Sequence, residues 1–235
     1  MQPLFSQSCN ILPFAQIRAL LRTALNGPPL SPEVWVWLSD MDERYSQAGR
    51  PSGLLGRVLG KIMAWYNQPD NQWTLDLLGL SGGEKILEIG YGPGQAIQMA
   101  SALCPKCQIV GIDHSDAMLA AASRLNKKAL AAGTVALSLG DVAALEFAEA
   151  SFDKVFSINC VYFWPDSARS FEELHRVLKT GGKLAITVRD KKRQAYRPFN
   201  RDNLKKMLSQ AGFSQVEIHS NGIASHPLLC GIAIK

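Results

Sequence analysis

The pattern of hydrophobic and polar residues changes period repeatedly from residue 84 onward. Short apolar runs, typical of buried strands, alternate with longer segments whose apolar residues recur at helical spacing. The runs predict seven strands, at residues 85–89, 108–112, 134–139, 154–158, 183–188, 215–219 and 228–234. The helical segments cover residues 95–103, about 115–125, the stripe 171–178, and 204–211. Gly181 and Gly182 are expected to end the third of these helices.

Strands that alternate with helices favour parallel pairing, with helices on both faces of the sheet. The connection between the last two strands is shorter than the dozen or so residues that a parallel crossover requires. These two strands are therefore predicted to pair antiparallel. We expect an α/β fold, with a doubly wound, mostly parallel seven-stranded sheet whose last strand is antiparallel.

The region before residue 84 differs from this core. Residues 1–32 contain no acidic residue and five prolines. Helix-like segments and a Gly/Pro-rich break near residue 50 predict an N-terminal helical arm at 1–50, a helical lid or cap at 51–83, and the core at 84–235. Organelle transit peptides are also poor in acidic residues. We expect a cytoplasmic location, and an organellar location is the alternative.

Composition places the chain among globular proteins, because 47% of its residues are hydrophobic and 19% are charged. It contains no uncharged apolar run of the roughly 18–20 residues that a membrane helix needs. Its five cysteines are an odd, scattered set, which favours a reducing setting. Cys104 and Cys107 form a lone C-x-x-C pair, which we expect to be incidental cysteines in a surface loop. Because no second pair exists at suitable spacing, no metal site is expected.

The net charge of +5 is concentrated in one segment. Residues 189–206 hold eight basic and two acidic side chains, and the rest of the chain is nearly neutral. Such a basic patch can bind an acidic substrate, RNA or a membrane surface, or it can be a solvated helix face.

A glycine-rich turn follows the first strand of the alternating series. It reads Glu88-Ile89-Gly90-Tyr91-Gly92-Pro93-Gly94, and glycines allow a tight turn and the close approach of a ligand to the backbone. Open α/β sheets bind ligands just outside the carboxyl ends of their strands. A dinucleotide fingerprint requires G-x-G-x-x-G, and Gln95 stands where the third glycine would fall. The spacing therefore favours a ligand without phosphates.

Polar residues also follow the next three strands. Asp113 ends the second strand, where a carboxylate can accept both hydroxyls of a ribose. Asp141 and Val142 follow the third strand, where an acid can meet an adenine amino group. After the fourth strand come Asn159 and then three aromatic residues, Tyr162, Phe163 and Trp164, at the expected mouth of the cleft.

Together these motifs resemble the class I S-adenosylmethionine-dependent methyltransferase family, motif by motif over about residues 84–190. The tract at 174–184 also resembles the family's helix into the fifth strand, with Thr180 where proline is more usual. The resemblance implies a Rossmann-like fold, S-adenosylmethionine as cofactor with S-adenosylhomocysteine as product, and in-line SN2 transfer of the methyl group.

The resemblance also implies a set of binding residues. Glu88 with Gly90, Gly92 and Gly94 would seat the amino-acid end of the cofactor, and Asp113 its ribose. Met118, Asp141 and Val142 would lie at the adenine, and the Asn159 backbone near the methionine part. The aromatic rings of Tyr91, Tyr162, Phe163 and Trp164 would offer their faces to the sulfonium, or else pack in the core.

Alignment of nucleophile, carbon and sulfur can supply roughly 7–11 kcal/mol, so a dedicated base is optional. If the acceptor is a hydroxyl, the candidate bases are Tyr162, Asp166 and His226.

The acceptor is expected to be a small molecule, acidic if the basic patch selects it. The core has no inserted substrate domain, and no Asn/Asp-Pro-Pro-Tyr/Phe motif follows the fourth strand. Small-molecule members of the family commonly fold the segment before the first strand over the cleft. Met63, Tyr66, Asn67 and Trp73 lie in that segment here and are expected to form a lid that excludes water. The alternatives are an RNA methyltransferase that uses the patch at 189–206, and a cofactor-binding protein without catalysis.

Overall fold

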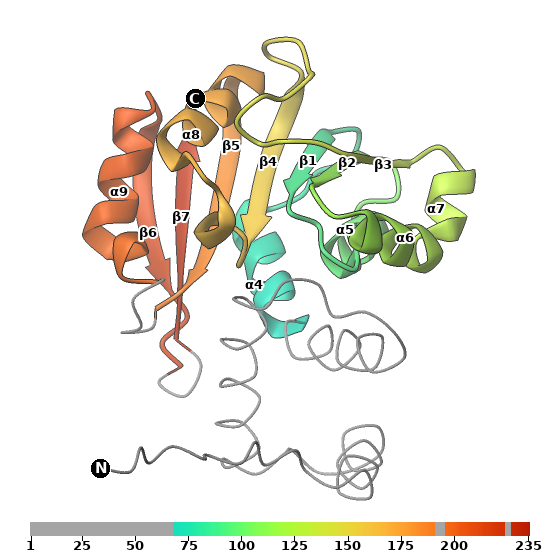
Figure 1. Ribbon diagram of the computed structural model, residues 1–235, viewed down its shortest axis with the longest axis horizontal. Coiled ribbons are helices and arrows are strands. Elements are labelled where there is room, and N and C mark those ends of the chain that lie inside the picture. The colour runs from blue at the N-terminus through green and yellow to red at the C-terminus, as the bar shows by residue number, and fades with distance from the viewer. Residues whose placement is uncertain (1–67, 191–195, 224–226) are drawn as a thin grey trace, which may run out of the picture. The chain divides into compact units, whose positions relative to one another are not determined.

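The computed structural model describes residues 68–190, 196–223 and 227–235 (Figure 1). The chain divides into two units, Met1–Arg57 and Val58–Lys235, and all of the described residues belong to the second. The expected arm at 1–50 lies outside the described residues, as do Met63, Tyr66, Asn67 and His226. The division into arm, lid and core therefore stays a prediction.

The core is a seven-stranded sheet with the order β3-β2-β1-β4-β5-β7-β6, which Figure 1 shows from right to left. The strands are β1 (Lys85–Ile89), β2 (Gln108–Asp113), β3 (Val135–Leu139), β4 (Phe152–Ile158), β5 (Leu178–Arg189), β6 (Ser214–Ser220) and β7 (Leu228–Ile234). Strands β1 to β5 pair in parallel, and β7 is antiparallel to both β5 and β6. The predicted fold class is confirmed.

Helices accompany the strands on both faces of the sheet. They are α4 (Gln68–Leu78), α5 (Gln95–Leu103), α6 (Asp116–Leu125), α7 (Lys127–Ala131), α8 (Ser167–Val177) and α9 (Arg201–Gln210), with short 3₁₀ turns η1 (Val161–Phe163) and η2 (Arg197–Phe199). One buried cluster joins the sheet to α8 and α9 through residues such as Phe171 and Leu204. A second cluster joins it to α4, α5 and α6 through residues such as Leu75, Ile97 and Ala122.

The strand order places a ligand-binding edge at β1 and β4. The chain runs outward from β1 to β2 and β3, then crosses back to β4 on the other side of β1. At such a reversal the connections leave in opposite directions, so a crevice opens outside the carboxyl ends of the two strands. We call the ends of β1, β2, β4 and β5, with the residues that follow each, the carboxyl edge.

Helix α4 runs along β4 and brings its first turn to this edge. At its far end, the Lys154 ammonium at the start of β4 donates to the Gly79 carbonyl. At its near end, the Asp70 carboxylate accepts from the side chain of Asn159, just after β4, at 2.7 Å. A segment that precedes the sheet in sequence therefore contributes a side chain to the carboxyl edge.

The end of helix α8 differs from its prediction. The helix stops at Val177, and Leu178 already has extended dihedrals, so Gly181 and Gly182 do not end it. Instead they belong to β5, in a long bulge where the pairing jumps from Phe152–Leu178 to Lys154–Lys183. The reason is a tertiary contact at the end of the sheet, where the Gly181 N–H donates to the Lys235 carbonyl at 2.9 Å.

The C-x-x-C pair also differs from its prediction. Cys104 and Cys107 form a disulfide, and both are buried, at 5% and 1% exposure. The reason is the turn between α5 and β2, in which the Cys107 N–H donates to the Cys104 carbonyl and the two Cα atoms lie 5.4 Å apart. Both sulfurs also lie within 3.3 Å of the Ser81 carbonyl oxygen, so the turn packs on the loop between α4 and β1.

Within the described ranges, no helix is both long and apolar enough to cross a bilayer. The same ranges contain no group of three or more His, Cys, Asp or Glu residues placed to hold a metal ion.

Candidate functional site

The glycine turn after β1 has a left-handed backbone at three positions. The φ angles of Gly90, Gly92 and Gly94 are 73°, 51° and 87°, a region that L side chains rarely adopt. A Cβ on Gly90 would lie 2.1 Å from Cys160 Sγ, and one on Gly94 would lie 2.7 Å from Ala122 Cβ. A Cβ on Gly92 would meet nothing within 4 Å. Gly90 and Gly94 are therefore required for packing, whereas Gly92 faces open space.

Two buried carboxylates flank this turn. Glu88 on β1 is 3% exposed, and its Oε2 has no hydrogen-bond partner among the described residues. Burial, and secondly the charge of Asp113, raise the pKa of Glu88 to about 8. A buried acceptor without a donor costs free energy, so a cationic N–H donor would be bound favourably at this position.

Asp113 is held by backbone N–H groups on two sides. Its Oδ2 accepts from Gly92 at 2.8 Å, and its Oδ1 accepts from Ser115 at 3.0 Å. Each carboxylate oxygen has a second lone pair, so both oxygens can still accept a ligand hydroxyl. The acid that the sequence predicts for a ribose therefore also shapes the glycine turn.

Tyr91 lies in the core. It is 3% exposed, its hydroxyl donates to the Ser138 carbonyl at 3.3 Å, and its ring fills the space beside Gly111. Burial, followed by the charges of Asp113 and Glu88, raises the pKa of Tyr91 to about 12. Of the two readings that the sequence left open, this environment favours the packing role.

The three residues predicted for the adenine lie around the ends of β2 and β3. Asp141 is exposed, and its Oδ1 accepts from the Ala143 N–H at 2.9 Å, which forms a local turn. Val142 is buried in the first core cluster, and Met118 on α6 is half-buried against the second.

Asn159 directly follows β4 and has a φ of 53°, which is unusual for a residue other than glycine. Its N–H donates to the Thr187 carbonyl at 2.9 Å and its Nδ2 to Asp70, while its Oδ1 has no partner among the described residues. The next residue, Cys160, packs against Gly90, and burial raises the pKa of its thiol to about 12. This thiol is therefore protonated and unreactive at neutral pH.

The aromatic residues after β4 have three different environments. The Tyr162 hydroxyl accepts from the Arg189 N–H, and its ring meets Tyr196 and Phe199 edge to face. Phe163 is 57% exposed, whereas Trp164 is 8% exposed and packs on Phe171. Only Phe163 presents most of its ring to solvent.

The candidate bases gain little support. Burial raises the pKa of Tyr162, which disfavours a phenolate at neutral pH. Asp166 is the N-cap of α8, where its carboxylate accepts from the Arg169 N–H at 3.0 Å. These two environments favour structural roles for both residues.

Asp70 and Arg189 are the residues at this edge that the sequence did not single out for it. Asp70 is fully buried, Arg189 is 5% exposed, and Arg189 Nη2 lies 4.0 Å from Asp70 Oδ2. Arg189 was assigned to the basic patch, but it does not lie on the surface. The patch as described keeps four exposed cations, Arg197, Arg201, Lys205 and Lys206. The sequence offered a signal in the positions of the two residues. Arg189 directly follows the strand predicted at 183–188, and Asp70 lies four residues before Thr74, on the same face of a helix.

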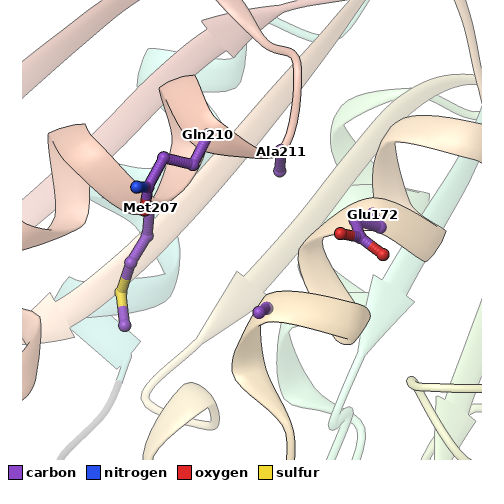
Figure 2. Close-up of a pocket in the computed structure, with 5 residues that line it drawn as sticks. Glu172, Met207, Gln210 and Ala211 are labelled. Atoms are coloured by element: carbon purple, nitrogen blue, oxygen red, sulfur yellow. The ribbon is translucent and has the colours of Figure 1, made fainter.

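A pocket also lies between α8 and α9. Ala168, Glu172, Met207, Gln210 and Ala211 line it (Figure 2). It shares no residue with the carboxyl edge, so the predicted cofactor residues do not belong to it.

Comparison with known proteins identifies the family. A family model described as a methyltransferase domain matches residues 87–186. The Bacillus subtilis protein named uncharacterized methyltransferase YdaC is 33% identical over 181 residues, which are 76% of this chain and 98% of that protein. The chain belongs to the class I S-adenosylmethionine-dependent methyltransferase family.

Two further matches cover only part of the matched protein. The O-methyltransferase resE of Aspergillus sclerotiorum is 34% identical over 137 residues, which are 53% of this chain and 51% of that protein. A solved Haemonchus contortus phosphoethanolamine N-methyltransferase 2, in complex with S-adenosyl-L-methionine, is 21% identical, with a TM-score of 0.62 over 72% of this chain and 52% of that one. The chain thus spans about half the length of each, and the structural likeness shows the shared fold. The matched range 87–186 includes every predicted cofactor residue from Glu88 to Asn159.

Proposed function

We propose that this methyltransferase binds S-adenosylmethionine at the carboxyl edge of β1, β2 and β4 and transfers its methyl group to a small-molecule acceptor. The observation that carries the proposal is the buried Glu88 carboxylate, whose Oε2 has no partner among the described residues. It lies at the start of the turn in which Gly92 faces open space. A carboxylate that lacks a donor beside an open glycine turn fits the ammonium of an amino-acid group.

The remaining residues fit the other parts of the cofactor. Asp113 keeps a free lone pair on each oxygen for the two ribose hydroxyls. Asp141, Val142 and Met118 lie around the ends of β2 and β3, where the adenine would bind. Asn159, at the end of β4, would face the methionine part. Gly90 and Gly94 would act indirectly, by keeping the turn in shape.

When bound, the cofactor would supply a sulfonium methyl group whose carbon a nucleophile attacks in line, so that the carbon–sulfur bond breaks and S-adenosylhomocysteine leaves. The residues of this chain then have to orient the donor and exclude water, and orientation alone is a large effect, roughly 7–11 kcal/mol in well-aligned systems. Since Tyr162 and Asp166 are engaged in structural hydrogen bonds, we assign no general base among them. Phe163, with its exposed ring, is the aromatic residue available to an acceptor.

A small-molecule acceptor is favoured over RNA by the structure of the basic patch. Arg189 is buried beside Asp70, so the densest part of the predicted patch does not present this cation outward. The structural neighbour described above is named as a phosphoethanolamine N-methyltransferase, and phosphoethanolamine is a small molecule. A lid remains part of the proposal. Trp73 lies on α4, half-buried against the second core cluster, so closure would depend on the residues before α4.

Binding and transfer are tested in two steps. Titration calorimetry with S-adenosylhomocysteine should show 1:1 binding, and Glu88→Ala should weaken it. Glu84 is a half-buried acid of the preceding loop, and Glu84→Ala should leave the affinity unchanged. Cofactor labelled at its methyl group is then incubated with the protein and host extract, and the label is separated into metabolite, RNA and protein fractions. Label in the metabolite fraction supports the proposal. Label in RNA, with activity falling steeply as salt rises, would overturn the choice of acceptor.

A further inference from the structure

Asp70 is a fully buried carboxylate in the first turn of α4. A buried charge is tolerated only when it is paired and hydrogen-bonded. Its Oδ2 accepts from Asn159 Nδ2 at 2.7 Å and lies 4.0 Å from Arg189 Nη2. One carboxylate therefore joins the helix before the sheet to the ends of β4 and β5.

The surrounding hydrogen bonds fix the same three elements to one another. Thr74 Oγ1 lies 2.7 Å from the Asp70 carbonyl oxygen, to which it donates, and 2.6 Å from Thr187 Oγ1 on β5. The Thr187 carbonyl in turn accepts from the Asn159 N–H at 2.9 Å. Asn159 is thus held through its backbone by β5 and through its side chain by α4.

The residue held in this way has a conformation that it would not adopt readily alone. Asn159 has a φ of 53°, and the adjacent Cys160 packs so tightly on Gly90 that a Cβ there would lie 2.1 Å from Cys160 Sγ. A change in the turn at residues 159–160 would therefore move a side chain into the glycine turn. The shape of the proposed cofactor site depends on Asn159 staying in the left-handed region.

We propose that Asp70 is a positioning residue for the methyl donor: by accepting from Asn159 Nδ2 it keeps the turn after β4 in the conformation that the cofactor site requires. This inference rests on the proposed function. It assigns a role in the site to a residue that lies before the range matched by the family model, 87–186, and outside every motif of the sequence. Asp70 acts through Asn159 and does not itself contact the donor.

The test measures the affinity for S-adenosylhomocysteine by calorimetry and the stability by thermal unfolding. Asp70→Ala should weaken binding about tenfold or more, because a hydrogen bond to a charged group is lost. Asp70→Asn should restore most of the affinity, since its amide oxygen still accepts from Asn159. Leu75→Ala is the matched structural control, because Leu75 is 2% exposed on the same helix and belongs to the second core cluster. It should lower the melting temperature and leave the affinity unchanged.

A double-mutant cycle separates positioning from general destabilisation. Glycine adopts a φ of 53° without strain, so Asn159→Gly removes the need to hold the turn. In that background Asp70→Ala should change the affinity less than about twofold. If Asp70→Ala does not fold because the buried Arg189 has lost the nearby Asp70 charge, Asp70→Ala with Arg189→Met removes both charges and takes its place in the cycle.

Each outcome has a defined meaning. Equal loss of affinity from Asp70→Ala in both backgrounds, or an equal loss from Leu75→Ala, overturns the positioning role while the proposed function stands. Wild-type protein that fails to bind S-adenosylhomocysteine overturns the proposed function and this inference together.

Discussion

The carboxylate of Asp113 accepts a hydrogen bond from the Gly92 N–H at 2.8 Å, which ties the end of β2 to the glycine turn after β1. Its other oxygen accepts from the Ser115 N–H and so fixes the start of α6. Two loops that follow neighbouring parallel strands are thus held by one side chain. A ligand at the carboxyl edge would meet a site that is already organised.

Asp113→Ala is therefore expected to affect both stability and binding. It removes two hydrogen bonds to a charged acceptor, each contributing about 1.5–3 kcal/mol. Chemical denaturation should show a lower free energy of unfolding, and calorimetry a weaker affinity for S-adenosylhomocysteine. Asp116→Ala, which removes an exposed acid three residues later, is the control and should change neither binding nor the turn. Unchanged affinity in Asp113→Ala would contradict the placement of the ribose.

The free energy of unfolding should fall as the pH rises because of Glu88. Its pKa is about 8 in the folded protein and 4.5 in the unfolded chain, so the folded state binds more protons between these two values. Unfolding then takes place with proton release, and the free energy of unfolding decreases across that window. Denaturation curves of wild type and Glu88→Gln, measured from pH 5 to about pH 8, should diverge, with the wild type losing more stability. Parallel curves would show that Glu88 is already ionised at the lower pH.

The same pKa predicts how cofactor affinity depends on pH. An ammonium binds the ionised carboxylate, so binding at pH 6–7 must first remove the proton from Glu88. The affinity of wild type for S-adenosylhomocysteine should rise as the pH approaches about 8, by up to about tenfold per pH unit. Glu88→Gln should bind weakly with a flat profile. A steep profile in that variant would assign the titration to another group.

Alanine substitutions in the glycine turn should separate packing from ligand contact. Gly92→Ala places its Cβ in open space, so only backbone strain of about 1–2 kcal/mol is expected, while a ligand in that space would be displaced. Gly94→Ala places a Cβ 2.7 Å from Ala122 Cβ and should lower the melting temperature much more. Thermal unfolding and calorimetry on both variants test this. Gly92→Ala with full affinity would argue against the proposed site.

The Cys104–Cys107 disulfide should contribute modestly to stability. It closes a short loop, with a sequence separation of 3, for which chain entropy gives about 2 kcal/mol. Reductant should lower the melting temperature of wild type by a few degrees. The Cys104→Ser/Cys107→Ser double variant should melt at the reduced wild-type temperature and show no response to reductant. Equal melting of wild type with and without reductant would show that the bond does not stabilise the fold.

Where a prediction depended on neighbours in sequence, it agreed closely with the structure. The strands at 85–89 and 228–234 and the helix at 95–103 have the predicted bounds. Buried strands and amphipathic helices carry their period within a few residues, so local sequence is sufficient to find them. The predicted end of α8 was wrong, because a bulge in β5 and a hydrogen bond from Gly181 to Lys235, 54 residues later, determine where the helix ends.

The sequence by itself determined the family, the alternation of strands and helices in an α/β core, and the positions of Glu88, Asp113 and Asn159 at strand ends, because motifs and periodicity are local properties. Only the tertiary structure decided which of these side chains have partners. Asp70 and Asn159 are 89 residues apart, and Arg189 is the last residue of β5, the strand that pairs with β4. Their contact depends on how α4 lies along β4, which no local pattern records. Packing between distant segments also explains three other features. Arg189 is buried, Glu88 Oε2 has no hydrogen-bond partner among the described residues, and the Tyr162 hydroxyl accepts from the Arg189 backbone.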